Sequence, residues 1–186
     1  MGQRTVLLIP DGVATNNNSG LSIVALSNIQ AIDVANGIMS LTADATMTFD
    51  NLTLAAGETI TSITPTMTGT ILSGAAVTIV IQQEILESDD TQLYTQNIGP
   101  NGADEATYVG TTRTTSDGST AWSNNDIDGL KIKLTFLANT ATRFWLLDFI
   151  GVTVVIETPP NIKGKIQHTS GKIQHTSGKI EMIDIP

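Results

Sequence analysis

The chain of 186 residues contains no cysteine, and only 4% of its residues are aromatic. Without cysteine it can form neither a disulfide, nor a catalytic thiolate, nor a cysteine zinc site. Hydrophobic residues still make up 40% of the chain, so the core has to be built from Ile, Leu, Val, Ala and Met. The shortage of aromatic residues also argues against a sugar-binding cleft, in which aromatic rings usually stack on the sugar.

Histidine is missing from the first 160 residues, because His168 and His175 both belong to a C-terminal repeat. A Ser-His-Asp triad, a histidine general base and a histidine metal site are therefore excluded for that part of the chain. Carboxylates remain, but no spacing identifies a glycosidase pair among them. The candidates are Glu84, Glu87, Asp89, Asp90, Asp126 and Asp128. We expect a protein that is not an enzyme and that holds no metal or other cofactor.

Basic residues are few, nine against eighteen acidic ones, which gives a net charge of -9. Four of the six lysines follow Pro159 and Pro160, so the preceding body is more acidic than the total suggests. An acidic body repels phosphate, and we expect no nucleic-acid partner. No stretch approaches the roughly 20 apolar residues of a membrane span, and the apolar run at the N-terminus stops at Pro10. We expect no membrane partner and synthesis in a cytoplasm.

Threonine and other β-branched residues are abundant, and strand patterns recur along the chain between turn residues. The alternation is clearest over residues 130–137. There, apolar residues share one face and two lysines share the other. The apolar ones are Leu130, Ile132, Leu134 and Phe136. These patterns predict an all-β fold, an antiparallel β-sandwich or jelly roll over residues 1–158, followed by an extended C-terminal repeat tail over residues 159–186.

Several segments give more local expectations. Residues 143–157 are almost continuously hydrophobic, which predicts a central strand, and Gly151 within them predicts a bend or bulge. Pro65 is expected at a sheet edge or a bulge, because proline cannot donate to a ladder. Residues 21–34 fit either a strand or a short helix, and residues 16–20 have the composition of a loop.

Residues 124–129 place oxygen-bearing side chains at alternate positions ahead of a glycine, as in the first half of an EF-hand loop. The glutamate that closes such a loop is replaced by Thr135, so an EF-hand is excluded. We expect a turn capped by Asn and Asp side chains ahead of a strand. A calcium site here is the less favoured alternative, as is half of a cation site at residues 87–90.

Residues 119–157 run from Ala121 and Trp122 through Asp126, Ile127 and the glycine turn to a last hydrophobic strand. This order resembles the last third of β-sandwich structural proteins of tailed bacteriophages. Short tandem repeats at the C-terminus are also similar to those of phage appendage and capsid proteins. The resemblance implies a virion component and brings no catalytic residues with it. We expect Trp122 and Trp145 to anchor the core rather than to stack on sugars.

The tail contains a seven-residue repeat, with copies at residues 164–170 and 171–177 and a partial copy at 178–180. One large apolar residue per unit is too few for a coiled coil. Either the tail has two equivalent faces, or each glycine makes a corner, so that each unit is a short strand that can stack on others. A disordered tether is the third possibility.

We expect the large apolar residues of the tail to carry assembly contacts. They are Ile166, Ile173, Ile180, Met182, Ile183 and Ile185. The expected partners are further copies of the chain, for instance in a trimer, and the major capsid or other virion proteins. The leading hypothesis is a capsid decoration (cement) protein whose sandwich sits on the shell while its tail clasps neighbouring subunits.

Two rival functions stay open. One is a tail or head-fibre component whose β-sandwich binds a receptor or glycan, and the other is a carbohydrate-binding module outside any virus. If His168 and His175 gather around a symmetry axis, they could bind a metal or make the assembly pH-sensitive.

Overall fold

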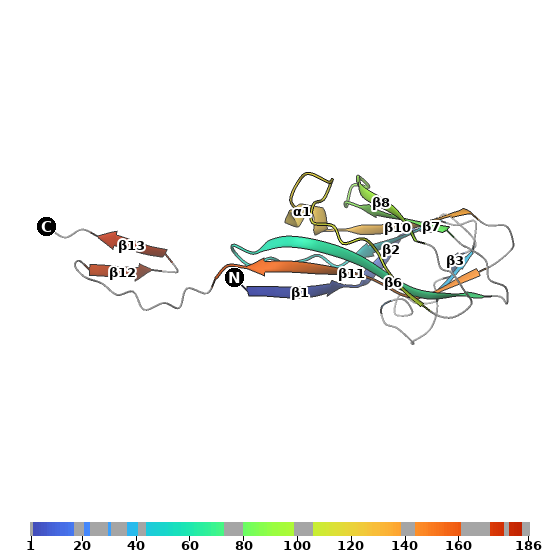
Figure 1. The fold of residues 1–186 in the computed structure, drawn as a ribbon, viewed down its shortest axis with the longest axis horizontal. Coiled ribbons are helices and arrows are strands. Elements are labelled where there is room, and N and C mark those ends of the chain that lie inside the picture. Colours follow the sequence, from blue (N-terminus) through green and yellow to red (C-terminus); the bar gives the residue numbers. More distant parts are fainter. Residues whose placement is uncertain are drawn as a thin grey trace.

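The computed structural model of the chain describes residues 2–16, 21–22, 30, 37–40, 44–72, 80–98, 106–138, 144–160, 172–176 and 179–183. Within these ranges the chain forms thirteen β-strands and one short helix. The described strands pair in ten ladders, all of which are antiparallel. Two sheets form the body (Figure 1), and this confirms the predicted β-sandwich.

The first sheet has the order β3-β4-β11-β6-β9, with β1 as a further partner of β11. Its strands are β1 (Gly2–Leu8), β3 (Leu21–Ser22), β4 (Gly37–Ser40), β6 (Thr59–Leu72), β9 (Ala106–Val109) and β11 (Phe144–Thr158). The long strand β6 runs along one side of β11. On the other side, β4 pairs with residues 144–147 and β1 with residues 152–158. The strand β11 is therefore central, as its hydrophobic sequence predicts.

The second sheet has the order β2-β5-β10-β7-β8. Its strands are β2 (Pro10–Asn16), β5 (Asp44–Phe49), β7 (Val80–Leu86), β8 (Gln92–Ile98) and β10 (Lys131–Ala138). The one-turn helix α1 (Asn124–Ile127) comes shortly before β10. The remaining two strands, β12 (Lys172–Thr176) and β13 (Lys179–Ile183), form a separate hairpin.

The hydrophobic core lies between the two sheets. The alternation of the sequence is confirmed at three positions: Leu130, just before β10, and Ile132 and Leu134 within it are fully buried. The side chain of Phe136 lies outside the described part. Facing residues of the first sheet complete the core, among them Ile63, Met67, Ile150, Val152, Val154 and Ile156. Because period-two alternation buries one face of each sheet, aliphatic residues can build this core with few aromatic rings.

The expected bulge at Gly151 is wrong. The register between β11 and β6 shifts once on each side of this residue, but Gly151 itself pairs in register with Thr66. A Cβ at this position would lie 2.6 Å from Cζ of Phe149 and 3.2 Å from the carbonyl oxygen of Leu8. Gly151 therefore makes room for close neighbours.

For Pro65 the expected edge position is wrong, but the expected bulge is confirmed. Thr66 pairs with Val109 and Ile63 bridges Arg113, so the chain that follows β9 has one residue more than β6 over this stretch. Its strand β6 has β11 on one side and β9 on the other, and Pro65 pairs in register with Val152. The Pro65 carbonyl accepts a hydrogen bond from the N–H of Gly110 at 2.8 Å, just past the end of β9. In an antiparallel ladder the N–H and C=O of one residue point to the same side. The donor that proline lacks would thus face Gly110, at the end of the β9 ladder and beside the bulge.

Two further expectations fall largely outside the described part. Of residues 21–34, the structure describes the two residues of β3 and Gln30, and β3 favours a strand at the start of that segment. Of the expected loop at residues 16–20, only Asn16 is described, as the last residue of β2. Among the described residues, no helix is long and apolar enough to cross a membrane.

Candidate assembly site at the root of the C-terminal tail

The tail leaves the sandwich at the end of β11, where Thr158 pairs with Gly2 at the start of β1. Pro159 and Pro160 follow directly and are exposed. Proline fixes its own φ, and a following proline keeps the preceding residue extended. The chain therefore continues outward from β11 rather than turning back at once.

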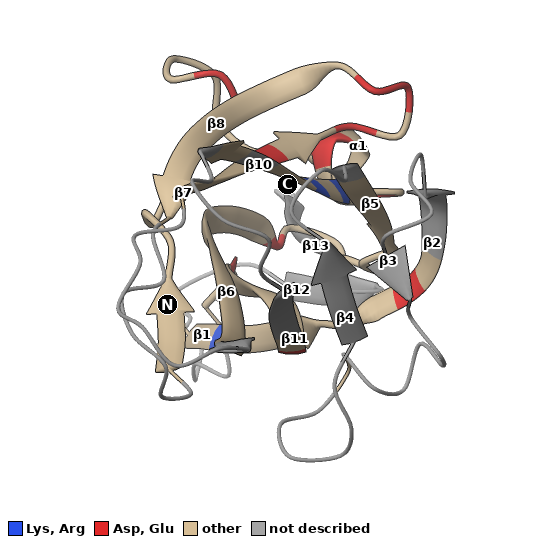
Figure 2. Ribbon diagram, turned by 90° about the vertical axis from the view of Figure 1, so that its right-hand side faces the viewer, with Lys and Arg blue, Asp and Glu red and all other residues tan. Residues whose placement is uncertain are grey.

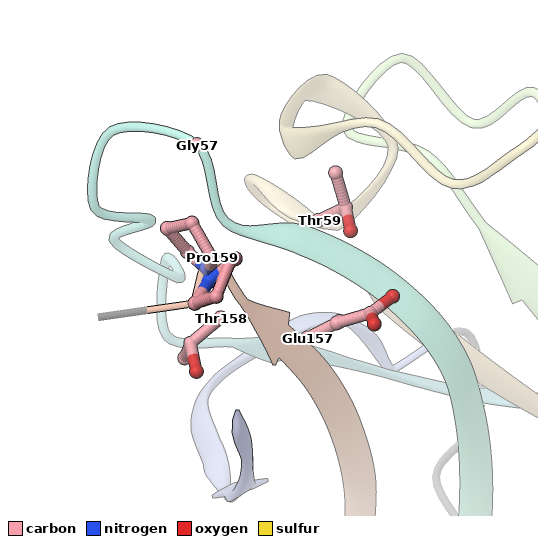
Figure 3. Close-up of a pocket in the computed structure, with 6 residues that line it drawn as sticks. Gly57, Thr59, Glu157, Thr158 and Pro159 are labelled. Atoms are coloured by element: carbon pink, nitrogen blue, oxygen red, sulfur yellow. The ribbon is translucent and has the colours of Figure 1, made fainter. Parts of the chain in front are cut away.

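We call the place where the tail leaves the sandwich the root of the tail, and a pocket of about 220 Å³ lies there. It is lined by Gly57, Thr59, Glu157, Thr158, Pro159 and Pro160. Figure 3 shows the turn that carries Gly57 beside the ring of Pro159. A Cβ at Gly57 would lie 3.3 Å from Cγ of Pro159, so the turn packs directly on the first proline of the tail.

An ion pair joins the same turn to β1. Arg4 donates from Nε to Oε1 of Glu58 at 2.9 Å and from Nη2 to Oε2 at 2.7 Å, and Nη2 also donates to the carbonyl of Thr53 at 3.1 Å. The Glu58 side chain is only 7% exposed, and its Oε2 accepts from the N–H of Ala55 at 2.8 Å. These bonds, led by the one from Arg4, lower the pKa of Glu58 to about 2.

These contacts hold the start of β1, the turn and the end of β11 together at the point where the tail begins. Sequence reasoning missed Arg4, Gly57 and Glu58. Arg4 and Glu58 are 54 residues apart, and no local pattern pairs them, since their contact depends on the topology of the sheet. Residues 1–158 contain three arginines and sixteen acidic residues, and nothing in the sequence singles out this pair.

Beyond the root, the tail forms the β12–β13 hairpin. The register pairs Lys172 with Ile183 at one end and Thr176 with Lys179 at the other. Ser177 and Gly178 separate the last pair in the sequence, and two residues that include glycine are typical of a hairpin loop. The two strands fit the interpretation in which each unit of the repeat is a short strand.

The predicted assembly residues are only partly brought together by this hairpin. Ile173 is opposite Met182, Ile180 is opposite His175, and Ile183 is opposite Lys172. Ile166 and Ile185 lie outside the described residues, as does His168. That these residues carry assembly contacts stays a prediction.

Residues 124–127, ahead of Gly129, form the one-turn helix α1 rather than the expected turn capped by Asn and Asp. Ser123 caps α1: its Oγ accepts from the N–H of Asp126, and Asp126 Oδ2 accepts from the N–H of Ser123 at 2.6 Å. Asn124 Nδ2 donates to Asp128 Oδ2 at 2.7 Å. As expected, the segment leads directly into a strand, β10.

Acidic residues gather around this helix and on the turn after β7 (Figure 2). Burial, followed by repulsion from Asp126 and Asp89, raises the pKa of Glu87. Lysines of β10 balance two other candidate carboxylates: Lys131 Nζ lies 2.7 Å from Asp90 Oδ1, and Lys133 Nζ lies 3.0 Å from Glu84 Oε2. In the part of the chain that the structure describes, no three His, Cys, Asp or Glu residues are placed to hold a metal ion.

Trp122 is 5% exposed and belongs to the core, as predicted. Its Nε1 donates to the carbonyl of Arg113 at 3.0 Å, and the Arg113 guanidinium lies 4.7 Å from the centre of the Tyr94 ring. The side chain of Trp145 lies outside the described part.

No protein-family model and no curated protein matches the chain. Among solved structures, an arabinose-bound α-L-arabinofuranosidase is 7% identical, with a TM-score of 0.42, over 79% of this chain and 26% of its own. A CBM4 structure is 13% identical, with a TM-score of 0.36, over 80% of this chain and 92% of its own. A structure of infectious bursal disease virus, Gx strain, is 12% identical, with a TM-score of 0.33, over 87% of this chain and 33% of its own.

The chain thus spans about a quarter of the arabinofuranosidase and about a third of the viral chain.

Proposed function

We propose that this chain is a non-enzymatic structural protein that assembles through its C-terminal tail, and that it serves as a capsid decoration protein of a tailed-phage virion. The observation that carries the proposal is the hairpin that the seven-residue repeats form outside the sandwich. A strand pair of this size does not stabilise itself in water, so its use lies in contacts with another surface. The phage assignment rests on the sequence resemblance of residues 119–157 and of the repeats.

In this proposal the body rests on the shell, and the tail joins neighbouring subunits. The root described above supports such a role, because an extended tail needs a fixed starting direction if it is to reach a defined neighbour. The Arg4–Glu58 pair and the packing of Gly57 on Pro159 provide that direction. The expected partners are further copies of this chain and a shell protein, with no nucleic acid and no membrane.

The test is co-sedimentation of the full chain with assembled shells of tailed phages. Wild-type protein is expected to sediment with a shell at a fixed stoichiometry. Ile173→Lys is expected to lower that amount severalfold, because it places a charge among the apolar positions of the hairpin. Gln174→Lys is the matched control, since it adds the same charge at the neighbouring position and should bind like wild type.

Equal binding of the two lysine variants would contradict a role for the tail. Failure to bind any shell, combined with saturable binding on a glycan array, would instead favour a fibre component with a receptor-binding sandwich.

A further inference from the structure

The β12–β13 hairpin has two edge strands, and its register places apolar residues on one side. In the described part of the chain, β12 and β13 pair only with each other, and Figure 1 shows them beyond the end of the sandwich. Their register sets Ile173 opposite Met182 and His175 opposite Ile180. Because strands alternate, these four positions share one side of the hairpin. That side is apolar apart from the histidine.

Natural sheets protect their edge strands by shortness, bulges, charge or proline. Most edges of this sandwich have such protection. In the first sheet β3 has two residues and β9 has four. In the second sheet the ladder from β2 to β5 shifts register twice. The other edge there, β8, is polar: Gln92, Thr95 and Asn97 are its exposed residues.

The strand β1 lacks this protection. Its seven residues pair with β11 without a register shift, and among the described strands β11 is its sole partner. It contains no proline and no lysine, and the charge of Arg4 is taken up by Glu58. Leu7 is 53% exposed, one of three large hydrophobic side chains that are exposed in the described part. A regular, partly apolar edge of this kind is suited to adding a strand.

We propose that the hairpin of one chain adds to the free edge of β1 in a second copy and so extends the first sheet across the interface. The inference rests on the proposed function, for which it names the docking surface. Edge addition would pair backbone groups of β1 that β11 leaves unpaired. The apolar side of the hairpin would continue the inward side of β1, formed by Val6 and Leu8. Its other side, which contains Ile183 beside polar residues, would continue the exposed side of β1, formed by Gln3, Thr5 and Leu7.

The direction of the tail favours a second copy over the chain's own β1. Since β1 and β11 are antiparallel and Gly2 is opposite Thr158, the tail leaves at the start of β1 and points away from it. Pro159 and Pro160 keep this direction for at least two residues. Thirteen residues, 159–171, connect β11 to β12, and an extended stretch of this length spans about 45 Å. That reach is long enough for the hairpin to contact a neighbouring molecule.

Charge also favours contact between a tail and another body. Residues 159–186 contain four lysines and two acidic residues, whereas residues 1–158 contain sixteen acidic and five basic residues. The tail of one copy is thus attracted to the body of another, while two bodies repel each other.

The absence of cysteine makes disulfide trapping in the full chain a direct test. Chains that carry Thr5→Cys on β1 are mixed with chains that carry Gln174→Cys or Glu181→Cys on the hairpin, and the mixture is mildly oxidised. Thr95→Cys is the matched control, because Thr95 is also an exposed threonine on an edge strand, β8. A disulfide requires Cα atoms within about 7 Å, so we expect about tenfold more heterodimer with Thr5→Cys than with Thr95→Cys.

Equal yields from the Thr5 and Thr95 variants would overturn the assignment to β1. A chain that carries both Thr5→Cys and Gln174→Cys and closes only an internal disulfide would overturn the assignment to a second copy. Light scattering of the unmodified chain separates these results from failure of the proposed function. If the chain is a monomer at every concentration and also fails to sediment with any shell, the proposed function itself is wrong. If it is an oligomer without the Thr5 crosslink, only the docking site fails.

Discussion

Gly129 and Gly118 are two residues with the same backbone requirement and different surroundings. Their φ angles are +73° and +91°. A Cβ at Gly129 would lie 2.8 Å from Cβ of Ser88, whereas a Cβ at Gly118 would meet nothing within 4 Å. The pair therefore separates the cost of a left-handed backbone from the cost of crowding.

We expect Gly118→Ala to lower the free energy of unfolding by about 1 to 2 kcal/mol, which is the cost of placing a Cβ in the left-handed region. Gly129→Ala should lose about 1 to 3 kcal/mol more, because Ser88 and the turn after β7 have to move. Urea unfolding of both variants measures the difference. Equal midpoints would show that the contact with Ser88 is not constrained.

Glu58 makes stability depend on pH in the acid range. Its pKa is about 2 in the folded chain, against an ordinary value of 4.5. A carboxylate with a lowered pKa stabilises the fold above its ordinary pKa, and this contribution is lost as the pH falls from about 4.5 toward 2. We expect the unfolding midpoint of wild type to fall more steeply over this window than that of Glu58→Gln.

Arg4→Lys should lie between the two, because lysine keeps the charge and loses the paired geometry of the guanidinium. Parallel pH profiles for wild type and Glu58→Gln would contradict the assigned role of the Arg4–Glu58 pair. This pair was not predictable from the sequence, since nothing near either residue indicates that β1 and the turn before β6 are neighbours.

At the scale of strands, alternation was the most reliable signal. The lysines and aliphatic residues of β10 identified its buried face, and the hydrophobic run of β11 identified a central strand. Gly151 was wrongly expected at a bulge, and Pro65 was placed at a bulge but not at an edge, because the same residue type serves several purposes. Glycine permits a bulge or a close approach, and proline suits an edge or a bulge. Only the neighbouring strands decide between these, and a single sequence does not reveal them.

Shortening a side chain to alanine should cost more stability on the buried face of β10 than on its exposed face. Leu134 is fully buried, so Leu134→Ala is expected to cost about 2 to 5 kcal/mol through lost burial and a cavity. Lys133 lies one residue away, on the other face, where it pairs with Glu84 and is 33% exposed. Lys133→Ala should cost less than about 1 kcal/mol. Comparable losses in urea unfolding would mean that the burial pattern of β10 is misassigned.

For the whole molecule, the sequence allowed a sandwich and a tail to be separated, and the division at residues 158 and 159 stays a prediction. The end of β11 at Thr158 and the isolated hairpin are consistent with it. What the repeats do could not be derived from their pattern alone, because a five-residue strand is stabilised by whichever sheet edge it meets. That edge belongs to the fold rather than to the repeat.

The central claim is that the tail assembles the chain, and the solution mass of two proteins tests it most directly. Light scattering is measured for the full chain and for residues 1–160 over a range of concentrations, and circular dichroism checks that both are folded β-proteins. The account predicts a discrete oligomer for the full chain and a folded monomer for residues 1–160. Equal masses for the two folded proteins would contradict it.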